Sequence, residues 1–185
     1  MAKNNILKTR KANDWKGLRS SVIDLQNANR ERVSLAKNGR RVLVVETDSE
    51  FDGVKEDGRI LIKPPLVGRN ASDLQASLDA SGYSTIILCR EPTTQLGLCP
   101  LVTLGDTTTV RTQVEEPVNQ AKPTAKWFDA SINELGATIV EKTDTFATND
   151  RKLDYLLGHF SAAPTYNGLY SSIIDVCDAL LEANG

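Results

Sequence analysis

Residues 58–89 read in turn as a strand, a helix and a strand, and this order restricts the fold more than any other part of the chain. The segment 58–64 (GRILIKP) is aliphatic and ends at a Pro-Pro pair. A helix with regularly spaced leucines follows, and Asn70 or Ser72 can cap its first turn. The segment 83–89 (YSTIILC) is again rich in strand-forming residues. A unit of this length predicts two parallel strands joined by a right-handed helical crossover.

Further strands are expected on both sides of this unit. The segment 41–47 (RVLVVET) has a run of Val and Leu, which is typical of a strand that is buried on both faces. The segments 101–104 (LVTL) and 107–114 (TTTVRTQV) flank Gly105-Asp106 and predict an antiparallel hairpin. Parallel and antiparallel pairs together predict a mixed sheet.

Helices are expected before and after the sheet. Trp15, Leu18 and Val22 recur at helical spacing after Asn13, which can cap this helix. Their apolar stripe is expected to be buried either on the rest of the chain or in a partner. Residues 1–13 are expected to form an extended basic tail. The remaining elements are a helix over 124–135 that ends at Gly136, a strand over 137–142, a short helix that starts at Asn149 or Asp150, and a final helix that starts at Asn167.

These elements predict an α/β fold, with α+β as the alternative. The expected architecture is a mixed β-sheet with flanking helices and an N-terminal helix that follows the basic extended tail. At 185 residues the chain is long enough for one domain with an appended arm. We expect residues 1–40 to form the arm and residues 41–185 to form the body.

Charge is divided between these two parts. Residues 1–41 contain eleven Lys and Arg against three acidic residues, a net charge of +8. The other 144 residues contain eleven Lys and Arg against twenty-one acidic residues, a net charge of −10. The overall charge of −2 therefore conceals a basic arm on an acidic body. Such asymmetry indicates contact with a polyanion, an acidic membrane surface or an acidic protein.

We expect the arm to contact an acidic neighbouring subunit, because opposite charges on two parts of one chain favour head-to-tail or ring assembly. The leading hypothesis is a non-enzymatic structural protein whose partners are copies of itself or other subunits, in a large oligomeric complex such as a virion or phage head–tail component. The expected arm contacts are Lys3, Lys8, Arg10, Lys11, Lys16 and Arg19, and the expected acidic patch is Asp48, Glu50 and Asp52.

Nucleic acid is an alternative partner for the arm, since the same cations can bind phosphates in a nucleic-acid-associated accessory protein. Trp15 is the only aromatic residue in the arm, so the stacking surface expected of a single-strand binder is missing.

A different alternative is a small α/β enzyme or ligand-binding module. The segment 63–72 leads from a strand into the start of a helix, where backbone N–H groups can hold a phosphate or nucleotide. Lys63, Arg69 and Ser72 are the residues expected to contact such an anion. Their spacing matches neither of the common phosphate-binding glycine motifs.

No cofactor or metal is expected. Asp48, Glu50 and Asp52 alternate before Gly53 as in a calcium loop, but the twelfth position of that loop is Arg59 rather than Glu. The lone histidine, His159, has no accompanying nucleophile motif, so no catalytic residue is predicted. Whether the chain is an enzyme therefore stays open, and the residues favour a non-enzyme.

The cysteines Cys89, Cys99 and Cys177 lack metal-binding spacing and are expected to be reduced, part-buried thiols. The N-terminus has no apolar core of a signal peptide, and no apolar run is long enough for a membrane span. We therefore expect no membrane partner and a cytoplasmic or virion location, without secretion by a signal peptide.

Overall fold

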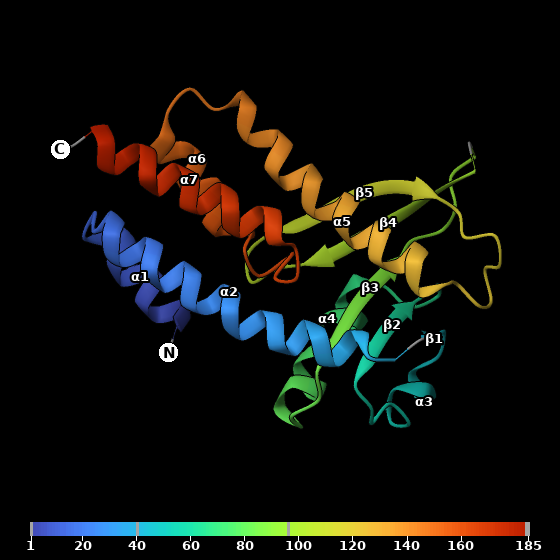
Figure 1. The fold of residues 1–185 in the computed structure, drawn as a ribbon. Coiled ribbons are helices and arrows are strands. Elements are labelled where there is room, and N and C mark those ends of the chain that lie inside the picture. The colour runs from blue at the N-terminus through green and yellow to red at the C-terminus, as the bar shows by residue number, and fades with distance from the viewer. Residues whose placement is uncertain (1, 40, 96, 184–185) are drawn as a thin grey trace.

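Within residues 2–39, 41–95 and 97–183, which the computed structural model describes, five strands form one sheet in chain order (Figure 1). Strands β1 (Val42–Val45), β2 (Gly58–Ile62) and β3 (Thr85–Arg90) run parallel. Strands β4 (Leu98–Leu104) and β5 (Thr109–Glu115) continue the sheet with antiparallel pairing. The predicted α/β class with a mixed sheet is confirmed, as are the parallel crossover and the hairpin.

Seven α-helices and one 3-10 helix accompany the sheet in the described residues. Side-chain caps support several of the starts: Asp14 accepts a hydrogen bond from the Gly17 N–H at 2.9 Å, and Thr124 accepts one from Trp127 at 3.2 Å. The helices are α1 (Ala2–Lys11), α2 (Trp15–Lys37), α3 (Asp48–Phe51), α4 (Gly68–Ala80), α5 (Ala125–Glu141), the 3-10 helix η1 (Lys142–Thr145), α6 (Asn149–His159) and α7 (Asn167–Ala183).

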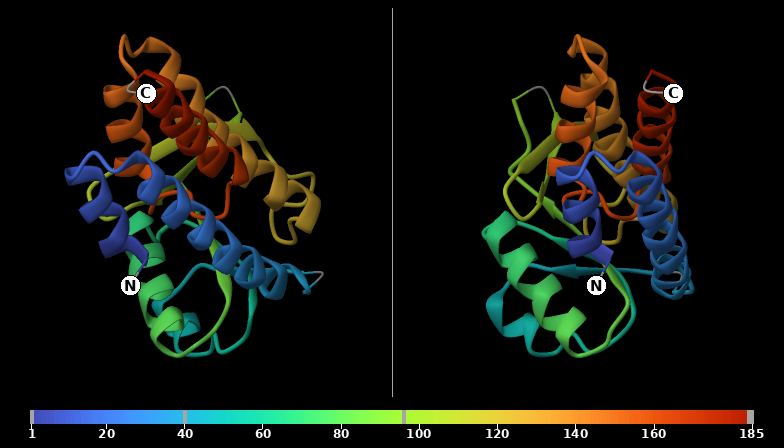
Figure 2. Two further views of the ribbon diagram at one scale, coloured as in Figure 1. Left: turned by 60° about the vertical axis from the view of Figure 1, so that its left-hand side comes forward. Right: turned by 90° about the vertical axis from the view of Figure 1, so that its left-hand side faces the viewer.

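The sheet separates two hydrophobic clusters, because successive residues of a strand point to opposite faces. In β2, Ile60 and Ile62 pack with Leu74 and Leu78 of α4, whereas Leu61 packs into the larger cluster on the other face. That larger cluster is built from α2, α5, α6 and α7. In the right-hand view of Figure 2, α4 and α2 accordingly lie on opposite sides of the strands.

The prediction of an extended basic tail is wrong, because residues 2–11 form helix α1, which packs against α2. Ile6 is only 6% exposed and belongs to the larger cluster. Burial of Ile6 stabilises α1 against the rest of the chain, and the basic composition of residues 2–11 does not indicate this contact. The predicted helix that follows is confirmed, and its Trp15 stripe is buried on the rest of this chain rather than in a partner. The division into an arm and a body stays a prediction, although both parts share one core.

The prediction of a strand over 137–142 is also wrong, since α5 continues through Glu141. Ile139 lies on the same buried face as Ile132 and Leu135, so tertiary packing overrides the strand preference of the β-branched residues. Gly136 does not end the helix either. A Cβ at Gly136 would lie 2.2 Å from the Tyr166 ring, so glycine is required here for close packing.

In the described part of the chain, no helix combines the length and the apolar character that a membrane span requires.

Candidate functional site

The pairing of β3 with β4 stops after two residue pairs. Cys89 pairs with Val102, and Arg90 pairs with Leu101. The same register would next bring Leu88 opposite Thr103 and then Ile87 opposite Leu104, but the ladder does not reach these residues. The two strands therefore separate toward the start of β3, although both continue, and the sheet is open at this point.

The tip of the β4–β5 hairpin is held by another part of the molecule. The Asp106 N–H donates to the Ser161 hydroxyl at 2.8 Å, and the Thr108 hydroxyl donates to the Gly158 carbonyl at 3.2 Å. A Cβ at Gly105 would approach the Ala162 nitrogen to 3.1 Å, so the turn lies directly against this segment. These contacts hold the end of β4 beside the α6–α7 connection.

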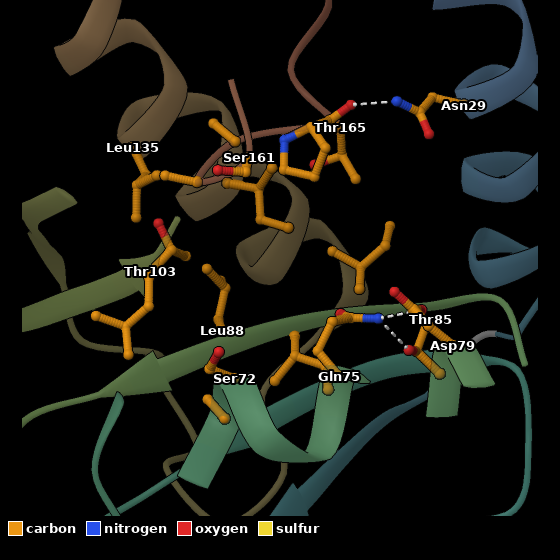
Figure 3. A pocket seen from close by; sticks show the side chains of 18 of the residues that line it. Asn29, Ser72, Gln75, Asp79, Thr85, Leu88, Thr103, Leu135, Ser161 and Thr165 are labelled. Atoms are coloured by element: carbon orange, nitrogen blue, oxygen red, sulfur yellow. Dashed lines mark hydrogen bonds between the residues drawn. The ribbon is translucent and has the colours of Figure 1, made fainter. Parts of the chain in front are cut away.

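A cleft of about 480 Å³ occupies the space between the separated strands. It is lined from both faces of the sheet, by α4 on one side and by α2, α5 and the α6–α7 connection on the other (Figure 3). Most of the deeper lining is apolar, and Ser72 and Gln75 of α4 add polar groups. The apolar lining includes Ile86, Leu88, Leu104, Ile132, Leu135 and Phe160.

A charged cluster crosses the cleft between α2 and α4. Arg32 of α2 forms an ion pair with Asp79 of α4 and lies 3.5 Å from the Thr85 carbonyl oxygen. The Gln75 amide donates to Asp79 at 2.7 Å and to the Thr85 hydroxyl at 2.9 Å, as Figure 3 shows. These side chains neutralise one another, so this part of the lining carries no unbalanced charge.

The Thr103 hydroxyl stands out among the polar groups of the cleft. Thr103 follows the last β4 residue that pairs with β3, and its Oγ1 atom is buried without a hydrogen-bond partner. It is the single buried side-chain oxygen or nitrogen without a partner among the described residues. A buried polar group in this state is uncommon in native proteins and requires an explanation.

A second, more polar groove of about 510 Å³ adjoins the cleft. It runs between α2 and the start of α7, and it shares Asn29, Val33, Pro164 and Thr165 with the cleft. Its other lining residues are Gln26, Arg30, Lys37, Asn133, Tyr166, Asn167 and Tyr170.

The predicted arm contacts are divided by the structure. Arg10 pairs with Asp154 at 2.7 Å and Asp150 at 3.2 Å, and these hydrogen-bonded carboxylates raise the pKa of its guanidinium. Arg19 pairs with Asp178 at 2.7 Å. These two cations thus meet acidic groups of their own chain. Lys8, Lys11 and Lys16 are exposed, and the Lys3 side chain lies outside the described residues.

The predicted acidic patch lies on α3 and the residue that follows it. Asp48 and Asp52 are exposed. The Glu50 carboxylate accepts hydrogen bonds from the Glu46 N–H at 2.7 Å and the Thr47 N–H at 3.0 Å, and these bonds lower its pKa. Glu50 therefore stabilises the start of the helix.

Arg59, the residue that argued against a calcium loop, is 6% exposed and forms a bidentate pair with Asp129 at 2.9 Å. It also donates to the Gly39 carbonyl at 2.6 Å, which ties the end of α2 to β2 and α5. Among the described residues, no group of three or more His, Cys, Asp or Glu side chains is placed to hold a metal ion.

The three residues of the predicted anion loop do not form one site. Lys63 pairs with Glu46, and Arg69 pairs with Asp73 at 3.0 Å. Ser72 alone of the three lines the cleft. Anion binding at the 63–72 loop stays a prediction, and both of its cations already have a carboxylate partner.

The three cysteines are free and are buried more completely than the part-buried thiols that the sequence predicts. Burial raises the pKa of Cys89 to about 12 and that of Cys177 to about 11, and it also raises the pKa of Cys99. His159 contacts the Tyr155 carbonyl through Nδ1 at 2.7 Å and stacks on the Tyr155 ring at 4.0 Å. These contacts give the histidine a structural role within α6.

Sequence reasoning missed the residues that form the cleft, above all Thr103, Arg32, Gln75 and Asp79. One signal was available, since Thr103 interrupts the apolar segment LVTL. The cleft itself depends on the residue at which β3 and β4 stop pairing, and no local sequence pattern predicts that position.

No protein-family model, no curated protein and no solved structure matches this chain.

Proposed function

We propose that this protein binds a small, mainly apolar molecule in the cleft between β3 and β4. The observation that carries the proposal is the early end of the β3–β4 ladder, which leaves a cleft of about 480 Å³ lined from both faces of the sheet. Small-molecule sites typically measure about 300–1,000 Å³ and combine an apolar lining with a few polar groups.

We call the boundary between β3 and β4 the seam. Its unpaired, open part has a free-energy cost that a bound ligand can offset. An unpaired buried hydroxyl such as that of Thr103 costs roughly 1–3 kcal/mol. An apolar ligand that covers the partly exposed Ile87 and Leu104 gains roughly 25 cal/mol per Å² of apolar surface removed from water. A hydrogen-bond acceptor near Thr103 adds a partner for its hydroxyl.

The test is binding of three neutral probes, 1-decanol, 1-naphthol and indole, followed by amide chemical shifts in NMR spectra. We expect at least one probe to shift signals from β3, β4 and α4. Ala76→Trp adds bulk to the exposed part of the lining and should weaken binding. Ser77→Trp is the matched control, because Ser77 is the next residue of α4 and does not line the cleft. Absence of binding by all three probes, or equal binding by both variants, would refute the proposal.

Assembly through opposite charges is a second candidate, favoured by the placement of the unpaired charges. Lys8 and Lys11 are exposed on α1, at the left of Figure 1. Asp48 and Asp52 are exposed at α3, at the lower right of the same view. Within the described residues none of these four side chains forms an ion pair. We propose that the lysines of one copy contact the α3 acids of the next copy, in a head-to-tail arrangement.

The assembly candidate predicts weaker self-association for two charge variants, Lys8→Gln/Lys11→Gln/Lys16→Gln and Asp48→Asn/Asp52→Asn, measured by sedimentation at low salt. Both leave Ile6 in place, so the core is retained. Duplex DNA binding by fluorescence anisotropy separates the nucleic-acid alternative. Tight, salt-sensitive duplex binding together with unchanged sedimentation would favour nucleic acid over assembly.

A further inference from the structure

The cleft and the adjoining groove differ in chemistry but share a boundary. The cleft is mainly apolar, and the groove is lined by amides and two cations. On the basis of the proposed cleft function, we infer that the natural ligand is an amphipathic anion. Its apolar tail occupies the cleft, and its carboxylate or phosphate headgroup lies in the groove beside Arg30 and Lys37.

The cleft and the groove share Asn29, Val33, Pro164 and Thr165, and Tyr170 of the groove contacts two of these residues. The Asn29 amide contacts the Pro164 carbonyl at 3.4 Å, which is longer than the usual 2.7–3.2 Å range for this bond. Figure 3 shows this contact at the edge of the cleft. The Tyr170 hydroxyl donates to the same carbonyl at 2.7 Å, and the Asn29 amide also donates to this hydroxyl. A ligand that spans both spaces therefore lies against this network, along the Val33 and Thr165 lining that the cleft and the groove share.

The charges favour an anion in the groove. Arg30 is exposed and has no ion-pair partner among the described residues, and Lys37 reaches Asp129 only at 3.7 Å. Among the described residues no carboxylate lines the groove, whereas amide donors of Gln26, Asn133 and Asn167 do. A guanidinium can donate two parallel hydrogen bonds to a carboxylate or a phosphate.

The charges of the cleft favour the uncharged tail of the ligand over its anionic headgroup. Arg32 is paired with Asp79, and the carboxylates of Asp79 and Asp106 both belong to the lining. Among the described lining residues Arg32 is the only cation, so an anionic headgroup inside the cleft would lie near these carboxylates without an unpaired cation beside it. The arrangement therefore orients an amphipathic anion with its tail in the cleft.

The experiment compares 1-decanol with decanoate and decyl phosphate by isothermal titration calorimetry, below micelle-forming concentrations and at pH 7.5. The variant is Arg30→Gln/Lys37→Gln, and the charge-matched control is Lys122→Gln/Lys126→Gln, at exposed positions outside both spaces. We expect the groove variant to bind at least one anionic probe about tenfold more weakly than the wild type, since a hydrogen bond to a charged group contributes roughly that factor. Decanol binding should be unchanged.

The outcomes separate this inference from the proposed cleft function. If decanol binds in the cleft while the anions bind no tighter, or if the groove variant and the control bind the anions equally, the headgroup inference is overturned and the cleft function stands. If no probe binds, the cleft function itself is overturned. A larger loss for decanoate or for decyl phosphate in the groove variant supports the inference and identifies the preferred headgroup.

Discussion

The two ends of the β3–β4 seam are built in opposite ways. At the carboxyl end of β3, Cys89 and Arg90 pair with β4, and the Glu91 N–H donates to the Pro100 carbonyl at 2.9 Å. At the other end, Ile86 and Leu88 still pair with β2 but line a cleft instead of pairing with β4. One pair of strands therefore forms a closed sheet at one end and a lined opening at the other.

The difference shows that the open end is supported rather than merely unpaired. The closed end is reinforced by Arg90, whose side chain is buried and pairs with Glu116 at 2.5 Å. The open end has the Arg32–Asp79 pair across α2 and α4, and Ser161 holds the hairpin tip. Each end thus has its own polar contacts, and those at the open end join α2 to α4 and the hairpin tip to the α6–α7 connection.

The largest expected effect comes from shortening a leucine at each end. Leu101→Ala at the closed end should cost about 4 kcal/mol of unfolding free energy, because Leu101 is fully buried and the cavity cannot collapse. Leu88 is also buried, at 1% exposed, but it lines the cleft, so the removed atoms have fewer packed neighbours and Leu88→Ala should cost only about 2 kcal/mol. Urea denaturation of both variants measures the difference. Equal losses would indicate that the open end is packed as tightly as the closed end.

Arg90→Ala is expected to cost about 3 kcal/mol. Removal of a buried ion-pair partner typically costs 3–5 kcal/mol, and the lower value applies because Glu116 retains some contact with solvent. Arg111→Ala is the control: Arg111 pairs with Glu91 near the same end of the seam but is largely exposed, so its loss should cost at most about 1 kcal/mol. Similar losses in the two variants would contradict a special role of Arg90 in closing the seam.

Much of the sheet could be predicted from the sequence, because its signals are local. The aliphatic runs of β1, β2 and β3 indicate strands wherever they occur, and turn residues separate β4 from β5. The two errors have tertiary causes. Ile6 is buried because α1 packs against α2, and α5 continues past Gly136 because Ile139 is buried on the same face as Ile132 and Leu135.

The candidate site could not be predicted in the same way. Arg32, Asp79 and Thr85 come from three different elements, and no spacing in the sequence relates them. The charge pattern of the sequence identifies the basic residues near the N-terminus. It does not identify their partners, because Asp150 and Asp154 lie about 140 residues away from Arg10 and come close to it only through tertiary packing.

Thr103→Val tests the polar group of the open end. The substitution removes a buried hydroxyl that has no partner, so we expect a gain of up to about 1 kcal/mol in unfolding free energy. Thr143→Val is the matched control, because the buried Thr143 hydroxyl donates to the Val140 carbonyl at 2.6 Å and its removal should cost about 1 kcal/mol. Thermal and urea denaturation measure both. A loss at Thr103 as large as that at Thr143 would mean that its hydroxyl is satisfied in solution.

The smallest effect concerns Cys89 at the closed end and is expected only at alkaline pH. Burial, with a smaller contribution from Glu91, raises the pKa of this thiol to about 12, whereas an unfolded thiol ionises near pH 8.5. Between these values the unfolded chain loses the proton first, so stability is complete below about pH 8.5 and falls as the pH rises toward 12. Urea denaturation at pH 7, 9 and 10 measures the fall, which should be shallower in Cys89→Ala.

The same thiol distinguishes the two ends by their access to solvent. At pH 8, iodoacetamide should leave Cys89 unmodified while it modifies the thiol introduced by Ser72→Cys, because Ser72 is exposed in the cleft lining and Cys89 is fully buried. Mass spectrometry after short exposure compares the two rates. Because reaction of Cys89 requires the paired end of the seam to open, a rate equal to that at position 72 would mean that this end opens as readily as the cleft, and the contrast between the two ends would not hold in solution.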